Sequence, residues 1–209
     1  MRAFLQRNDV RFAVLGNRSC GKTTLIKRVI GRAPDIREGA TSREEYIGKF
    51  KLPLQYISVV GHSVSVKRLY DFGGDPDRDW PLWDAAFTRD QPDGIIFMVD
   101  HENLDQHREA FEFFLDFLEK KDTQWLLFKG RHVAARERLK VVLFLINKED
   151  EWRKTYSFED IYGYFADLLR RLDSLKIPTT SYACSALEGT NVNEALADFF
   201  GRIFTEKGT

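Results

Sequence analysis

Short, uninterrupted apolar runs alternate along this chain with stretches in which apolar residues recur every three or four positions. Three runs, at residues 12–15, 95–99 and Val141–Ile146, have the length of strands and no polar position, which is typical of strands covered on both faces of a sheet. The helical stretches are 23–30, 104–121, 158–175 and Val192–Phe204. This alternation predicts an α/β fold with a mostly parallel sheet and helices on both faces.

Two segments depart from this alternation. Residues 46–60 and 64–70 are apolar-rich and joined at Gly61-His62, which predicts a hairpin that adds one antiparallel strand. Residues 122–138 are partly basic and show no clear period, so we expect a solvated connection with one helical turn. A chain of 209 residues can bury one sizeable core, and we expect a single domain over residues 1–209.

Composition narrows the class of protein. Lys plus Arg and Asp plus Glu each number 32, for a net charge of +0, so no overall charge favours nucleic acid as a partner. Two cysteines, Cys20 and Cys184, are a poor disulfide framework and favour a reducing, cytoplasmic compartment. No apolar run approaches the roughly 18 residues of a membrane span. Residue 2 is arginine and the last residues lack a prenylation cysteine, so we expect no direct lipid anchor and membrane contact only through a partner.

A glycine-rich segment follows the first predicted strand and opens the first predicted helix. It reads Gly16-Asn17-Arg18-Ser19-Cys20-Gly21-Lys22-Thr23 and matches the phosphate-loop pattern Gly-x-x-x-x-Gly-Lys-Thr. In this context backbone N–H groups can surround phosphates, Lys22 can reach the β- and γ-phosphates, and the Thr23 hydroxyl can bind Mg²⁺. The candidate phosphate-binding residues here are Gly16, Arg18, Ser19, Cys20, Gly21, Lys22, Thr23 and Thr24.

A second motif, Asp71-Phe72-Gly73-Gly74, ends a predicted strand. This places Asp71 at the carboxyl edge of the sheet, where ligands of open α/β folds bind, so it can join the Mg²⁺ shell. The Gly74 N–H can contact the γ-phosphate, which is present in GTP and absent from GDP. Asp-x-x-Gly alone is a common turn, and its place downstream of the phosphate loop is what indicates a switch.

Two further segments indicate a guanine base. Asn147-Lys148-Glu149-Asp150 follows the most apolar strand, and the Asp150 carboxylate can accept hydrogen bonds from the N1–H and the amino group of guanine. Adenine offers no such pair, so discrimination can reach roughly 10⁴-fold. We expect Lys148 to pack over the base and Asn147 to tie its loop to the phosphate loop. Ser185-Ala186-Leu187 is expected to donate a backbone N–H to the guanine O6.

The order of these four segments resembles that of the Ras superfamily of small GTPases. The double glycine followed by Trp80-Pro81-Leu82-Trp83 is most similar to the Arf-like branch. The lack of a lipid-anchor signal suggests either a prokaryotic-type relative or a shortened chain. The resemblance implies a Ras-like P-loop GTPase fold, with a mostly parallel six-stranded sheet and one antiparallel edge strand. It also implies a Mg²⁺·GTP ligand and switch segments that bind effectors, exchange factors and GTPase-activating proteins. Thr41 matches the switch threonine, so the implied metal ligands are Thr23, Thr41 and Asp71.

One departure from the family bears on hydrolysis. Where the family has a glutamine that orients the attacking water, this chain has Asp75, which a triphosphate repels and which cannot donate an N–H. We therefore expect slow intrinsic hydrolysis. Arg37, which resembles an arginine finger supplied in cis, and Arg18 are candidates to offset the loss, since such a finger is worth roughly 10³ to 10⁵ in rate. A solvent-facing arginine is the alternative for each, and the candidate catalytic positions are Arg37, Asp75 and Arg18.

The residues after the double glycine have two interpretations. Pro76 and the charges of residues 77–79 suggest a mobile switch II, and an ordinary solvated loop is the alternative that we favour. We expect Trp80 and Trp83 to pack against a neighbouring helix rather than form an exposed effector patch. The leading hypothesis is a GTP-hydrolysing switch. The alternative suggested by Asp75 is a GTP-binding scaffold with little hydrolysis, and the residues 147–150 disfavour a P-loop ATPase or kinase.

Overall fold

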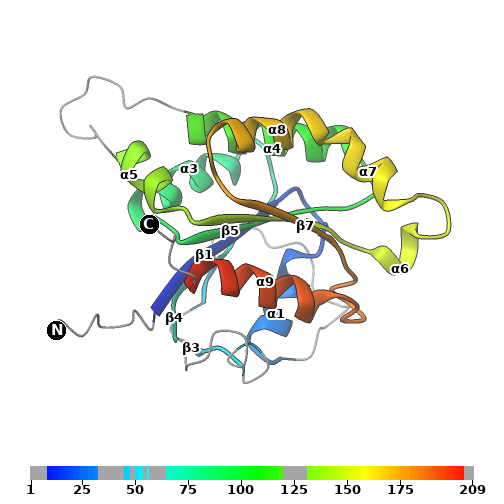
Figure 1. The fold of residues 1–209 in the computed structure, drawn as a ribbon, viewed down its shortest axis with the longest axis horizontal. Coiled ribbons are helices and arrows are strands. Elements are labelled where there is room, and N and C mark those ends of the chain that lie inside the picture. The colour runs from blue at the N-terminus through cyan, green and yellow to red at the C-terminus, as the bar shows by residue number, and fades with distance from the viewer. Residues whose placement is uncertain are drawn as a thin grey trace.

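The computed structural model describes residues 9–32, 45–47, 50–53, 56, 65–119 and 131–204. One sheet runs through the centre with helices on either side (Figure 1). The strands are β1 (Asp9–Gly16), β2 (Glu45–Ile47), β3 (Phe50–Lys51), β4 (Ser65–Asp71), β5 (Gly94–Val99), β6 (Val141–Ile146) and β7 (Thr179–Ala183). The helices are α1 (Lys22–Val29), α3 (Trp80–Asp90), α4 (Leu104–Glu119), α5 (Arg131–Arg138), α6 (Glu149–Trp152), α7 (Phe158–Tyr164), α8 (Ala166–Ser174) and α9 (Val192–Phe204). None of these helices is long and apolar enough to cross a membrane.

The strand order explains how the sheet reaches its antiparallel edge. The order is β2-β4-β1-β5-β6-β7, and β4, β1, β5, β6 and β7 are parallel to one another. β2 and β3 both pair antiparallel with β4, β2 near its end (Glu45 opposite Asp71) and β3 near its start (Lys51 opposite Ser65). The two short strands therefore occupy the same edge of the sheet, one after the other along β4, so that the seven strands fill six positions. The predicted mostly parallel sheet of six strand positions with an antiparallel edge is confirmed.

Side chains of the central strands alternate between two apolar layers, because successive Cβ atoms of a strand point to opposite faces. In β5, Ile95, Phe97 and Val99 face the layer under α3, α4, α5, α7 and α8. Ile96 and Met98 face the layer under α1 and α9 on the other side (Figure 1). Every residue of β5 and β6 is buried. Burial on both faces is the reason that these strands carry no polar position.

The predicted helix 158–175 is two helices. Phe165 leaves the helical conformation, with φ −105° and ψ 2°. Its ring is fully buried and contacts the rings of Phe111 and Phe144, at centroid distances of 6.3 and 5.2 Å. The break between α7 and α8 thus coincides with the placement of an aromatic side chain in the core. The sequence pattern, read as one continuous helix, did not predict this break.

Two other predicted segments also differ. Within the described part of 46–60, strand structure is limited to β2 and β3, and Tyr56 N–H instead closes a turn to the Pro53 carbonyl (3.0 Å). Tyr56 is buried with its ring 5.7 Å from that of Phe200, so core packing outweighs the strand pattern. The single turn expected in 122–138 is the eight-residue helix α5, which buries Ala135.

Of the residues before α3, 76–78 are exposed as their charges predict, whereas Asp79 is not. Asp79 is buried, accepts the Asp75 N–H (3.0 Å) and pairs with the Arg78 guanidinium (2.8 and 3.0 Å). Burial raises the pKa of Asp79, but these hydrogen bonds outweigh it and hold the pKa below its ordinary value. Trp80 and Trp83 are buried and pack on each other and on an aromatic ring of α4. Their predicted packing is confirmed.

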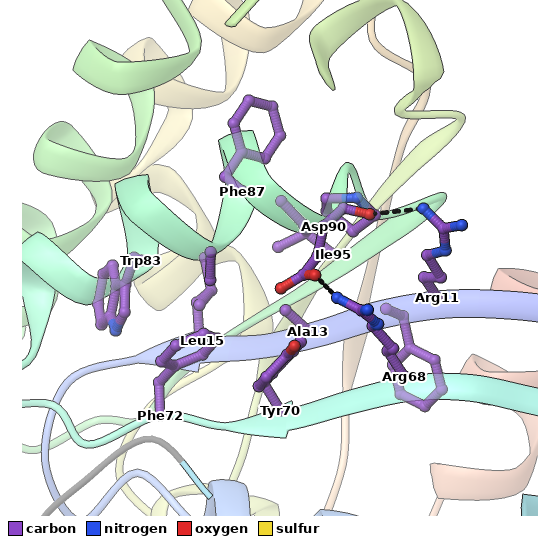
Figure 2. A pocket seen from close by; sticks show the side chains of 13 residues that line it. Arg11, Ala13, Leu15, Arg68, Tyr70, Phe72, Trp83, Phe87, Asp90 and Ile95 are labelled. Atoms are coloured by element: carbon purple, nitrogen blue, oxygen red, sulfur yellow. Dashed lines mark hydrogen bonds and ion pairs between the residues drawn. The ribbon is translucent and has the colours of Figure 1, made fainter. Parts of the chain in front are cut away.

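The C-terminal end of α3 is fastened to β1 and β4 (Figure 2). Arg68 of β4 forms an ion pair with the Asp90 carboxylate, and Arg11 of β1 donates to the Asp90 carbonyl (3.0 Å). Trp83 and Phe87 line the narrow apolar crevice between α3 and the strands, which has a volume of about 20 Å³. That is room for about one water molecule, so α3 packs closely on the sheet.

Candidate functional site

The predicted site residues meet where the parallel strands end. β1 ends at Gly16 and β4 at Asp71, whereas Asn147 and Cys184 directly follow β6 and β7. These ends lie at the same edge, because the four strands are parallel members of one sheet. This is the edge where open α/β sheets bind ligands.

The loop between β1 and α1 presents a helix N-terminus. Gly21 directly precedes α1 with φ 92°, and a Cβ there would lie 2.2 Å from Asn147 Nδ2, so the position requires glycine. The first turn of α1 has no acidic residue, and its last turn has Lys27 and Arg28. The positive end of the helix dipole is therefore uncompensated by side chains and suits a phosphate.

The polar groups of this loop differ in exposure. Lys22 is buried, and its Nζ donates to the Asn17 carbonyl (2.7 Å), so the ammonium folds back over the loop. Arg18 and Ser19 are exposed. Asn17 Nδ2 donates to Gln106 of α4 (3.1 Å) and its Oδ1 accepts the Arg18 N–H (2.8 Å). The loop is thereby braced on one side and open to solvent on the other.

Thr23 and Asp71 form the candidate metal pair. Thr23 Oγ1 donates to Asp71 Oδ2 at 2.6 Å, and Asp71 is 1% exposed. A hydroxyl and a carboxylate are the hard oxygen ligands that Mg²⁺ prefers, so this donor set fits the ion. The third predicted ligand, Thr41, and the candidate finger, Arg37, lie outside the described residues.

The second motif lies directly against the phosphate loop. A Cβ at Gly74 would be 2.2 Å from the backbone N of Arg18, so only glycine permits this approach. The neighbouring Asp75 uses its carboxylate to accept the Arg78 N–H (3.2 Å) and its own N–H to bind Asp79. In this structure, then, the Asp75 side chain closes the turn that leads into α3.

Asn147 joins the loops at this edge of the sheet. Its Nδ2 donates to the Cys20 carbonyl (2.8 Å), its Oδ1 accepts the Ala186 N–H (2.8 Å), and its carbonyl accepts Trp152 Nε1 (2.7 Å). The predicted link between the Asn147 loop and the phosphate loop is present. Its second link, to Ala186, connects both loops to the one that follows β7.

The backbone donors of residues 185–187 are not equally free. The Ala186 N–H is engaged by Asn147, and the Ser185 N–H donates to the Thr190 carbonyl (3.1 Å). Across the part of the chain that the structure describes, the Leu187 N–H alone of the three has no hydrogen bond. If one of these groups reads a base, it is the Leu187 N–H.

Lys148 and Asp100 form an ion pair beside this loop. Lys148 Nζ lies 2.8 Å from Asp100 Oδ2 and 2.7 Å from Glu102 Oε2, and Asp100 also contacts His107 Nε2 at 2.9 Å. Burial raises the pKa of Asp100, but the bonds to His107 and Lys148 outweigh it and hold the pKa below its usual value. Burial lowers the pKa of Lys148, and its two carboxylate partners raise it beyond its ordinary value. Both groups are charged at neutral pH.

Asp150 lines an open hollow between the Asn147 loop and the loop after β7. Its volume is about 370 Å³, and its wall includes Glu188 and Thr190. Asp150 Oδ1 is buried and has no hydrogen-bond partner among the residues described. Because a buried acceptor without a partner costs about 1–3 kcal/mol, a ligand with a matching donor would be favoured here.

Comparisons with known proteins address the fold. No family model matches the sequence, and no curated protein matches it. Solved structures do match, among them the Arl6 BBS3 small GTPase from Trypanosoma brucei with bound nucleotide analogue GppNp. The TM-score is 0.65 at 20% sequence identity, over 93% of this chain and 97% of that chain. This chain has the small-GTPase fold. The Ras-like fold predicted from the four segments is confirmed.

Three residues that hold the loops at the carboxyl edge of the sheet in this small-GTPase fold were not predicted to do so. Arg28 of α1 donates to the carbonyls of Ala186 and Leu187, Trp152 donates to Asn147, and Asp100 holds Lys148. Asp100 carries a usable signal, because it is a polar residue directly after a buried strand. Arg28 and Trp152 carry none, since nothing in their neighbourhood along the chain indicates their partners.

Proposed function

We propose that this protein is a guanine-nucleotide-dependent molecular switch that binds GTP with Mg²⁺ and hydrolyses it slowly to GDP. The observation that carries the proposal is the hydrogen bond from Asn147 to the Cys20 carbonyl. It holds the candidate base loop directly against the candidate phosphate loop, so that one ligand could contact both. The small-GTPase fold supports this assignment.

Each part of the nucleotide has a matching group. Backbone N–H groups of residues 16–24 and Lys22 would bind the phosphates, with Lys22 leaving its present carbonyl partner. Thr23 and Asp71, together with Thr41, would hold Mg²⁺, which neutralises charge on the phosphate oxygens. The Gly74 N–H would contact the γ-phosphate. Because Gly74 already lies on the loop at Arg18, the γ-phosphate would alter its position and that of the residues leading into α3.

The base would be read by Asp150 and a backbone donor. The two oxygens of the Asp150 carboxylate, of which Oδ1 is unpartnered here, would accept from guanine N1–H and the amino group, and Leu187 N–H would donate to O6. Lys148, fixed by Asp100 and Glu102, would pack its aliphatic stem over the ring.

Binding partners and compartment belong to the same proposal. Effectors, exchange factors and activating proteins would recognise residues 37–41 and 74–88, because these are the segments that the γ-phosphate rearranges. Cys20 and Cys184 are both free and buried, and burial raises the pKa of the Cys184 thiol to about 12. Unreactive, unpaired thiols are compatible with a reducing cytoplasm.

Base choice is the direct test of the proposal. Nucleotide extracted from the purified protein should be GDP or GTP, and fluorescent GDP should bind saturably with Mg²⁺ and be displaced by GTP but not by ATP. Asp150→Asn should lose guanine affinity and gain xanthine affinity, because xanthine has a carbonyl where guanine has the amino group and an amide can donate to it. Glu151→Gln, the adjacent exposed carboxylate, is the matched control. Displacement by ATP as readily as by GTP would overturn the assignment.

The arginine candidates require a rate measurement. Single-turnover hydrolysis of GTP should fall by 10³-fold or more if an arginine finger is removed. Arg37→Ala and Arg18→Ala are the two variants, and unchanged rates in both would exclude these two residues as fingers.

A GTP-binding scaffold with little hydrolysis is the second candidate. It is favoured by one observation, that the Asp75 carboxylate is engaged by the Arg78 N–H and lacks a donor for an attacking water. Protein that purifies with GTP and releases little phosphate, even with an activating protein added, would favour the scaffold over the switch.

A further inference from the structure

Arg28 connects the phosphate-binding helix to the loop after β7. It lies in the last turn of α1, and two nitrogens on one edge of its guanidinium donate to successive carbonyls. Nε donates to the Ala186 carbonyl and Nη2 to the Leu187 carbonyl. The planar fork of arginine suits such paired acceptors, and a lysine offers no equivalent geometry.

The remaining bonds of this loop leave it few alternatives. Its ends are tied by Ser185 N–H to the Thr190 carbonyl (3.1 Å) and by Gly189 N–H to the Ser185 carbonyl (2.7 Å). Gly189 has φ 91°, and a Cβ there would be 2.8 Å from Arg28 Nη1. The third nitrogen of the guanidinium therefore lies close against the loop backbone.

The direction of one N–H follows from these contacts. In a trans peptide the carbonyl of one residue and the N–H of the next point in opposite directions. Because Arg28 holds the Ala186 carbonyl toward α1, the Leu187 N–H in the same peptide plane points away from α1. That N–H is the member of the 185–187 set left without a hydrogen bond in the described structure.

We propose that Arg28 is a positioning residue for base recognition, which turns the Leu187 N–H toward the O6 atom of a bound guanine. This inference rests on the proposed function of the site. Arg28 does not touch the base in this scheme. It acts through the peptide plane between Ala186 and Leu187.

The test compares GDP with 6-thioguanosine diphosphate. The thio compound keeps the N1–H and amino group that Asp150 reads and replaces O6 with sulfur, a weak acceptor. Wild-type protein should bind GDP about five- to tenfold more tightly than the thio compound, the value of one hydrogen bond. Arg28→Ala should lose this preference by weakening GDP alone, and Arg28→Lys should keep part of it. Arg32→Ala, an exposed arginine just after α1, should leave the preference unchanged.

The outcomes separate this inference from the proposed function. If wild-type protein binds neither diphosphate, the nucleotide assignment fails. If it binds GDP with the expected preference and Arg28→Ala weakens both compounds equally, or neither, the positioning role alone is wrong. Gly189→Ala, whose added Cβ displaces the guanidinium, is a second variant and should lower the same preference. An unchanged preference in folded Gly189→Ala would also contradict the role.

Discussion

At the scale of single residues, Asp75 is the position at which the resemblance to the Ras superfamily leads us to expect a glutamine that orients water. Its carboxylate accepts the Arg78 N–H and so closes a turn. We expect Asp75→Gln to raise the single-turnover rate of GTP hydrolysis at least about tenfold, because the amide can donate to the attacking water and its neighbours. Asp77→Gln, two residues away and exposed, should have no effect. Equal rates for wild type and Asp75→Gln would show that position 75 does not limit hydrolysis.

A second prediction at this scale concerns Asp100 and the pH dependence of the unfolding free energy. Its pKa in the folded state is lower than the unfolded value of about 3.9. Its stabilising contribution is therefore complete above about pH 4 and is lost as pH falls through the folded pKa. Asp100→Asn leaves Lys148 and His107 without their carboxylate and should cost about 3 kcal/mol at pH 7.

The measurement is urea unfolding of wild type and Asp100→Asn at pH 7 and pH 3. The difference in unfolding free energy between the two proteins should be largest at pH 7 and should shrink at pH 3. Asp173→Asn, an exposed carboxylate at the end of α8, should show little difference at either pH. A deficit of the same size at both pH values would mean that the ionised form of Asp100 adds nothing.

At the scale of elements, α3 is the helix most closely connected to the candidate switch. Trp83 is 1% exposed, and its Nε1 donates to the Gly73 carbonyl (3.3 Å). One side chain of α3 is therefore both packed in the core and hydrogen-bonded to the double glycine. Trp83→Ala should lower the unfolding free energy by about 3–5 kcal/mol, because it leaves a large cavity. Leu82→Ala, on the partly buried side of the same helix, should cost less. Chemical denaturation of the three proteins measures both, and equal losses would contradict a special role for Trp83.

At the scale of the whole molecule, the proposed nucleotide would connect the loop after β1 with the loops after β6 and β7, at the carboxyl edge of the sheet. A ligand that binds only the folded state stabilises it by about 2.7 kcal/mol at one hundred times its Kd. GDP with Mg²⁺ should therefore raise the Tm, and chelation of Mg²⁺ should reduce the shift because Thr23 and Asp71 lose their shared ion. ATP at the same concentration is the control. An equal shift with ATP, or one that EDTA does not change, would contradict a Mg²⁺-dependent guanine site.

Local pattern was sufficient for most of the fold at this scale. β5 and β6 follow directly from unbroken apolar runs, because strands buried on both faces carry no polar position. α9 follows from its helical period, because a helix buried on one face repeats apolar residues every three or four positions. The break at Phe165 and the turn at Tyr56 were missed, because each depends on a ring entering a core built by distant segments. The burial of Asp79 was missed for a similar reason, since its compensating hydrogen bonds come from a turn that charge alone does not reveal.

By itself, the sequence determined the residue types available to a nucleotide: the phosphate-loop glycines, Lys22, Thr23, Asp71 and Asp150. Glycine spacing and carboxylate chemistry are properties of short segments, so they can be recognised locally. Only the tertiary structure decided that Asn147 occupies the Ala186 N–H, that Asp75 closes a turn, and that Arg28 holds the loop after β7. These contacts join residues whose partners are chosen by how the sheet brings strand ends together, and a hydrogen bond depends on that geometry to within a few tenths of an ångström.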